Sequence, residues 1–212
     1  TRVDQTVTSW LDVGVNVLLS RYTRSSSDTN AFFQAFVNPP VYNIYNDSNK
    51  VAYPEKFDSP QLYGFGNSYA NPYAVARYNE NSEKGTNLVF STYAQLSLLD
   101  GKLKMKTSYN LDMQSYRNQG YVPEYFVGGS QGVSVSTLTK IYGQADSHII
   151  DNTITYTDLI GRHSFSVMAG QSTRIERFSA MNGSGINVPA YDSQSMYISN
   201  GSNSGSLVSD TS

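Results

Sequence analysis

Five stretches of the chain alternate apolar and polar residues with the period of two that a β-strand requires. They are residues 12–23, 86–99, 102–116, 147–158 and 163–178. The connections between them are alternately long and short. Because consecutive antiparallel strands reverse direction, the short turns lie at one end of the predicted sheet and the long segments lie at the other. The pattern predicts an all-β, up-and-down antiparallel arrangement.

The stretch 102–116 shows the two faces of such a strand most clearly. Its apolar side holds Leu103, Met105, Thr107, Tyr109, Leu111 and Met113. Its polar side holds Lys104, Lys106, Ser108, Asn110, Asp112 and Gln114. The other four stretches divide in the same way, and none of the alternate apolar-side positions within 13–19, 88–98, 150–156 and 165–169 is charged. This purity fits a lipid-facing wall, where a buried Lys or Arg costs about 2–4 kcal/mol, but a soluble sheet alternates as well.

Strand length and loop placement favour the membrane interpretation. The predicted strands exceed the usual length of about 5–6 residues in globular sheets. The long segments 24–85, 117–146 and 179–212 share one end, and the turns at Asp100-Gly101 and 159–162 share the other. Short periplasmic turns and long extracellular loops are typical of outer-membrane β-barrels. Five strands cannot close a barrel, so we expect a section of a larger transmembrane barrel with long extracellular loops.

The long segments differ in composition. Segment 24–85 is rich in Pro, Asn, Ser and aromatic residues, which predicts an ordered loop with little helix. Its aromatic side chains either stack on a ligand or pack a small core of the loop itself. The ligand hypothesis places binding on Tyr42, Tyr45, Tyr63 and Tyr69. Segment 179–212 is rich in Ser, Gly and Asn, and we expect a mobile loop.

Charge and chemistry exclude several classes of function. The net charge of −2 offers no field for nucleic acid, and the absence of Cys excludes disulfides and thiolate metal sites. His148 and His163 lack the spacing of a metal site, and no catalytic motif is present. We therefore expect no enzyme, no metal and no cofactor. The chain begins at Thr1 without Met, and we expect a piece of a longer polypeptide.

Several segments resemble a known family. They are residues 4–16, 39–47, 71–74, 151–156 and 161–170, and their order along the chain fits that family. The chain is similar to the barrel of SusC/RagA-type TonB-dependent transporters from the outer membrane of Bacteroidetes. No single segment is a chemical signature, so the resemblance depends on the whole series.

The resemblance implies a partial TonB-dependent receptor barrel of 22 strands covering residues 1–212. It implies a plug and a TonB box outside this sequence, a SusD-like surface lipoprotein as partner, and contact with the TonB complex through those outside parts. The expected role is import of oligosaccharides or peptides across the outer membrane. The barrel would be surrounded by the lipid of that membrane. The alternative is a soluble secreted β-sandwich, either a carbohydrate-binding module or an adhesin. The sequence does not identify the imported molecule.

Overall fold

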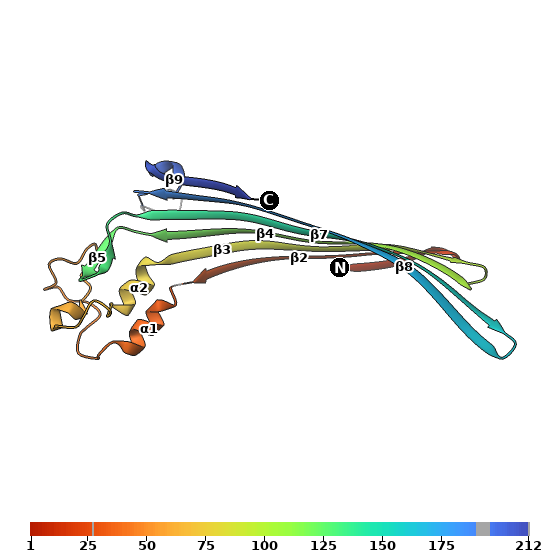
Figure 1. The fold of residues 1–212 in the computed structure, drawn as a ribbon, viewed down its shortest axis with the longest axis horizontal. Helices are drawn as coiled ribbons and strands as arrows, with labels where there is room; N and C mark the ends of the chain where they lie inside the picture. Colours follow the sequence, from red (N-terminus) through yellow and green to blue (C-terminus); the bar gives the residue numbers. More distant parts are fainter. Residues whose placement is uncertain (27, 190–195, 212) are drawn as a thin grey trace.

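A computed structural model describes residues 1–26, 28–189 and 196–211, with β9 described by its backbone alone after residue 202. Within these residues, seven strands form one antiparallel sheet in the order β1-β2-β3-β4-β7-β8-β9 (Figure 1). Their bounds are β1 Arg2–Thr8, β2 Leu11–Ser26, β3 Glu80–Leu98, β4 Leu103–Val122, β7 Thr137–Ile160, β8 His163–Ile186 and β9 Ser202–Thr211. The predicted all-β, up-and-down antiparallel fold is confirmed.

The remaining elements gather at one end of the sheet, and the tight hairpin turns lie at the other (Figure 1). They are the helices α1 Asn30–Val37 and α2 Pro72–Tyr78, the short 3-10 turns η1 Pro60–Tyr63 and η2 Ile198–Asn200, and the hairpin β5 Tyr125–Gly128 with β6 Gln131–Val133. Among the described residues, no helix is both long and apolar enough to cross a membrane.

The strands run further toward this end than the sequence predicts. β3 begins at Glu80, β4 continues to Val122, β7 begins at Thr137 and β8 continues to Ile186. The loops expected over 24–85, 117–146 and 179–212 are therefore too long. The added residues are mainly polar on both faces, so they carry no alternation. They stay in the sheet because backbone hydrogen bonding between neighbouring strands does not depend on side-chain type.

Two strands at the sheet edges were not predicted. β1 has only two apolar residues, Val3 and Val7, and is held by pairing with β2. β9 lies in a segment that was expected to be loop, and it pairs with β8. The expectation of a loop throughout 179–212 is wrong for 179–186 and 202–211. Residues 190–195 and 212 of that segment lie outside the described part of the chain.

The two hairpin turns exchange their predicted lengths. Leu98 pairs with Leu103, so the first turn has four residues, and Leu99, Asp100 and Gly101 all adopt positive φ. Ile160 pairs with His163, so the second turn has two residues, with Gly161 at φ 62°. Glycine at the first central position of a two-residue loop is typical of a type II′ turn, whose twist suits a hairpin.

The strand register confirms the two predicted faces. Phe90 lies between Val17 on β2 and Leu111 on β4, and Ile154 lies beside Met105. All the predicted apolar positions of the five strands share one face, which we call the apolar face; the other is the polar face. Within the described residues no second sheet or helix layer covers the apolar face, and its side chains are broadly exposed, with Val167 at 63%.

Candidate functional site

The long connection between β2 and β3 folds with the β5–β6 hairpin into one compact unit, the loop lobe (residues 28–79 and 125–133). Its core consists of Phe57, Ala74, Tyr78, Tyr125 and Val127. The chain therefore has its best-packed interior outside the sheet. A rigid lobe at this end provides a fixed surface on which a ligand can be recognised.

Buried amide side chains join the parts of the lobe. Asn71 caps α2 by accepting from the backbone N–H groups of Tyr73 and Ala74, and it donates to the carbonyls of Ile44 and Asp58. Gln131 on β6 exchanges two hydrogen bonds with the backbone of Asn71, at 2.7 and 3.0 Å. These contacts fix segments that lie far apart in sequence.

Asp58 is a fully buried carboxylate at the edge of the aromatic cluster. It accepts hydrogen bonds from the Asn43 and Ser59 backbone, from the Asn46 amide at 2.9 Å and from the Tyr63 hydroxyl at 2.9 Å. Four donors replace the water that a carboxylate loses on burial. The carboxylate thereby holds the loop around residues 43–46 against η1.

The structure places the four predicted ligand tyrosines in three separate aromatic groups. Tyr42 stacks on Tyr63, with ring centroids 6.2 Å apart. Tyr45 stacks on Phe57 at 5.0 Å, and Tyr69 packs edge-on against its neighbour Phe65 at 5.8 Å. The packing alternative thus accounts for one side of each ring. Tyr45 and Tyr63 nevertheless remain 49% and 45% exposed, so part of each side chain is accessible to a ligand.

The phenols of this cluster are neutral donors at ordinary pH. Burial, with a smaller effect of the Asp58 charge, raises the pKa of Tyr42 to about 12. The hydrogen bond to Asp58 raises the pKa of Tyr63. Burial and a hydrogen bond to Tyr73 raise the pKa of Tyr45. The sequence did not single out Asp58 or Tyr73, because a lone Asp or Tyr in a loop gives no pattern.

The polar face of the sheet carries two of the three alternate lysines at the start of the predicted strand 102–116. Lys104 and Lys106 lie on it, and the Lys106 ammonium sits 4.7 Å from the centre of the Tyr93 ring. Lys102 instead lies in the turn and pairs with Asp158 at 2.7 Å. A depression of about 280 Å³ next to Lys106 is also lined by Asp4. This face therefore carries charged and polar side chains.

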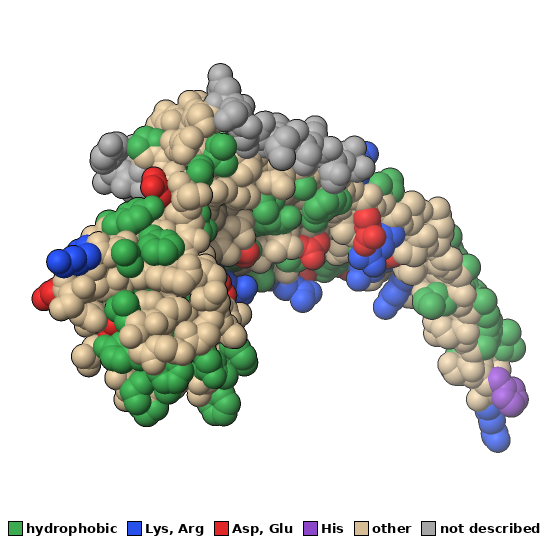
Figure 2. All heavy atoms as spheres, turned by 60° about the vertical axis from the view of Figure 1, so that its left-hand side comes forward, with side chains coloured by type: hydrophobic (Ala, Val, Ile, Leu, Met, Phe, Trp, Pro, Cys, Tyr) green, Lys and Arg blue, Asp and Glu red, His purple; other side chains and the backbone are tan. Residues whose placement is uncertain are grey.

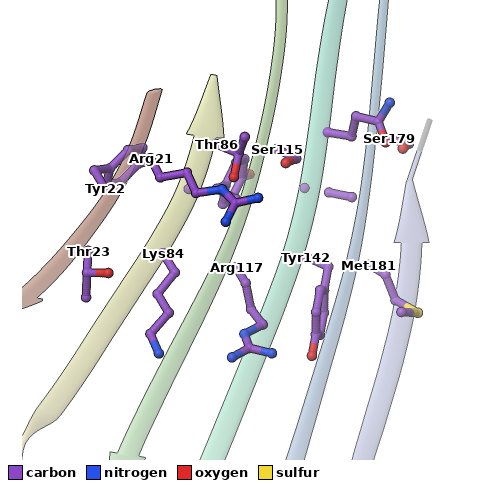
Figure 3. Close-up of a pocket in the computed structure, with 15 residues that line it drawn as sticks. Arg21, Tyr22, Thr23, Lys84, Thr86, Ser115, Arg117, Tyr142, Ser179 and Met181 are labelled. Atoms are coloured by element: carbon purple, nitrogen blue, oxygen red, sulfur yellow. The ribbon is translucent and has the colours of Figure 1, made fainter. Parts of the chain in front are cut away.

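The apolar face carries a larger depression of about 580 Å³ beyond its apolar rows, toward the loop lobe. Arg21, Lys84 and Arg117 extend over it from three neighbouring strands (Figure 3). Lys84 and Arg117 lie outside the predicted strands, and Arg21 lies near the end of one, beyond its last apolar position Leu19, so only the strand register brings the three together. Sequence reasoning missed this group for that reason.

No arrangement for metal chemistry occurs in the described part of the chain, where no group of three or more His, Cys, Asp or Glu lies close together. His148 lies on the apolar face, with Nδ1 2.8 Å from the Tyr109 hydroxyl and Nε2 2.9 Å from Asp146 Oδ2. This local network satisfies both ring nitrogens.

Comparison with known proteins shows the fold. No family model matches the chain, and no curated protein matches it. A structure of the RagAB peptide transporter matches with a TM-score of 0.67 at 14% identity, over 98% of this chain and 24% of that chain. Structures of the RagAB peptide importer in the closed-closed and open-open states give TM-scores of 0.71 and 0.69 at 18% and 16% identity.

These two matches cover 98% and 99% of this chain and 23% of the solved chains. The chain therefore spans about a quarter of the length of the solved proteins that it matches. It shares the fold of part of a transporter.

Proposed function

We propose that this chain forms part of the wall of an outer-membrane importer for nutrients. The observation that carries the proposal is the uncovered apolar face, whose predicted apolar positions are all uncharged, opposite a charged polar face, on strands of 16 to 24 residues. A wall between lipid and a hydrated path needs this division. Closure into a 22-stranded barrel, with the missing strands, plug and TonB box supplied by sequence outside this chain, is part of the proposal.

The imported solute is an oligopeptide in this proposal, and the loop lobe captures it before it passes along the polar face. The similar solved structures are of a peptide importer. Tyr45 and Tyr63 offer partly exposed aromatic rings on which peptide side chains can pack. The role is non-enzymatic, needs no cofactor and draws energy from the TonB complex. A glycan is the competing solute, because its rings also stack on aromatic side chains.

A SusD-like lipoprotein is the proposed partner at the loop lobe. Helix α1 exposes three phenylalanines, with Phe32 at 80%, Phe33 at 59% and Phe36 at 89%. Figure 2 shows hydrophobic side chains gathered on the surface of this end of the molecule. Clustered exposed aromatic residues are typical of protein interfaces.

The first experiment tests location. An antibody against this segment is used on fractionated source cells, with boiled and unboiled samples compared by electrophoresis. We expect a band several-fold heavier than 23.4 kDa in the outer membrane that shifts on boiling. A soluble band near 23.4 kDa without a heat shift would support the secreted β-sandwich and overturn the importer.

The second experiment tests the site. Uptake of labelled oligopeptides and of labelled oligosaccharides is measured in cells that carry Tyr45→Ala with Tyr63→Ala in the complete protein. We expect peptide uptake to fall about tenfold, the loss of about 1.4 kcal/mol of binding. The exposed Val51→Ala in the same lobe is the control. Unchanged uptake would remove these tyrosines from the site, and a loss restricted to oligosaccharides would identify a glycan importer.

A further inference from the structure

We propose that Arg21, Lys84 and Arg117 form a binding site for the phosphate groups of an anionic lipid on the outside of the wall. The inference rests on the proposed function, because it takes the apolar face to lie against lipid. It adds a specific lipid ligand at the level where the apolar rows end. The expected ligand is a phosphorylated glycolipid of the outer leaflet.

The register brings the three cations together. Lys84 and Arg117 lie directly opposite each other on β3 and β4. Arg21 on β2 lies opposite Thr86, two residues along β3 from Lys84. Two residues along a strand span about 7 Å, so the cations form two adjacent rows on one face. Figure 3 shows their side chains extended over the same depression.

The positive charge of this depression has no internal counter-ion. None of the residues that line it is Asp or Glu. Within the described part of the chain, none of the three cations lies within ion-pair distance of a carboxylate. Of the carboxylates on the same face, Asp146 is engaged with His148 and Glu80 with Arg77. An external anion would complete the site.

The pairing of Lys84 with Arg117 is itself evidence for a ligand. Like charges directly opposite each other on neighbouring strands destabilise a sheet. A phosphate bound between them would turn that repulsion into two charge-assisted contacts. Arginine suits this role because its planar guanidinium donates two parallel hydrogen bonds to phosphate oxygens. Hydroxyl groups of Thr86, Ser115 and Ser179 line the same depression and add donors.

The surroundings favour a lipid over a free anion or the transported solute. The apolar rows toward the turns begin with Leu19, Leu88 and Met113 on β2, β3 and β4, whereas Asp146 and Arg177 occupy the first of these rows on β7 and β8. Acyl chains attached to the bound phosphate would lie along these apolar rows. The ring of Tyr142 stands beside Arg117, at 6.0 Å from its guanidinium, where amphipathic aromatic residues mark a membrane interface. The solute path lies on the opposite side of the sheet.

The size of the depression agrees with a headgroup larger than a single phosphate. Its volume of about 580 Å³ falls within the range of about 300–1,000 Å³ of small-molecule sites. Two rows of cations suit a headgroup that carries two phosphates. The side chains reach the site from paired strands, so the sheet register fixes the spacing of their backbone positions.

Native mass spectrometry of the complete protein in detergent tests the proposal, with diphosphoryl lipid A as the probe. The variant combines Arg21→Gln, Lys84→Gln and Arg117→Gln. The matched control removes the same charge from the polar face by Arg2→Gln, Lys104→Gln and Lys106→Gln. We expect affinity for the probe to fall about tenfold or more in the first variant and to stay within about twofold in the control.

Three further measurements separate loss of lipid binding from misfolding and from binding of a free anion. Lys84→Gln alone removes the like-charge pair, so we expect normal heat-resistant assembly with weaker lipid binding. Lipid A without its phosphates should bind weakly, and inorganic phosphate alone should not displace the intact lipid. Equal binding by the variant or by dephosphorylated lipid A would overturn the proposal, and displacement by inorganic phosphate would identify a free-anion site instead. Failure of the importer proposal would appear separately, as absence of the protein from the outer membrane.

Discussion

At the scale of single residues, buried polar side chains organise the loop lobe. Asn71 is fully buried and makes hydrogen bonds with both ends of its amide. Asn49 donates to the carbonyls of Phe57 and Val127, at 2.7 and 2.8 Å. Each amide replaces the water that a loop backbone would otherwise need. The surface that carries the predicted ligand tyrosines depends on these contacts.

Asn71→Ala should loosen the lobe without affecting the sheet. The change removes the cap of α2, worth about 1 kcal/mol, and leaves the carbonyl of Asp58 without its donor, at about 1–3 kcal/mol. The carbonyl of Ile44 keeps the backbone N–H of Asp58 as its other donor. Amide hydrogen exchange in α2 should therefore become at least about thirtyfold faster. The matched control is Asn67→Ala at an exposed position of the same lobe. Unchanged exchange in α2 would contradict this account of the cap.

Tyr42 makes the stability of the lobe fall at high pH. Its hydroxyl is buried and has no hydrogen-bond partner in the described residues, and its pKa rises to about 12 in the folded lobe. A raised pKa means that the stabilisation is complete below the unfolded value of about 10 and is lost as pH rises toward 12. Partial exposure limits the effect to about 1 kcal/mol.

Tyr42→Phe should therefore flatten the loss of stability above pH 10. At neutral pH the variant should be as stable as the parent or more so, by up to about 1 kcal/mol, because it removes an unsatisfied buried hydroxyl. Lobe unfolding followed by near-ultraviolet circular dichroism across this pH range gives the comparison. A parallel loss of stability in parent and variant would exclude Tyr42 as the group concerned.

At the scale of elements, tyrosines on the polar face cover glycines on the neighbouring strand. Tyr93 lies over Gly14, Tyr22 over Gly85 and Tyr116 over Gly143, each pair directly opposite in the register. A ring that covers a paired glycine restores the contact area that the missing side chain would leave open. Two of the pairs join β2 with β3 and one joins β4 with β7, and they help to fix the register of strands whose polar residues do not specify it.

Gly143→Ala should weaken this part of the sheet. An added Cβ would lie 2.3 Å from the Tyr116 ring, so the ring must move away. Displacement costs about 1 kcal/mol or more. The temperature at which the folded band is lost on electrophoresis should fall. Gly120→Ala on the adjacent strand is the control, because no atom lies within 4 Å of its added Cβ. Equal effects of the two substitutions would show that ring displacement is not the cause.

At the scale of the whole molecule, the two faces of the sheet define its surroundings. In water, an exposed apolar face of this extent would drive association. In a bilayer the same face contacts lipid hydrocarbon, where a charged side chain is energetically costly. The effect of a charged substitution at an exposed position therefore separates the two environments.

Val167→Arg provides this comparison. Val167 is 63% exposed, so a soluble protein would tolerate arginine there. On a lipid-facing wall the change costs about 2–4 kcal/mol, and the amount of heat-resistant protein in the outer membrane should drop sharply. Ser166→Arg, on the opposite face of the same strand, should assemble normally. Equal assembly of both variants would place the apolar face away from lipid.

The sequence by itself determined the two faces, the antiparallel order of the five central strands and the end at which the long connections lie. These features follow from side-chain alternation and from the reversal of direction at each turn, and both are local properties of the chain. The aromatic richness of segment 24–85 also predicted a small core as one alternative, which Phe57 and Tyr45 confirm.

Tertiary structure alone decided the strand ends, the edge strands β1 and β9, and the grouping of Arg21, Lys84 and Arg117. Polar residues beyond the apolar rows join the sheet through backbone hydrogen bonds, which leave no trace in side-chain type. Lys84 and Arg117 are 33 positions apart and become neighbours only when the turn at 99–102 sets the register between β3 and β4. A shift of one residue would move every side chain of a strand to the other face.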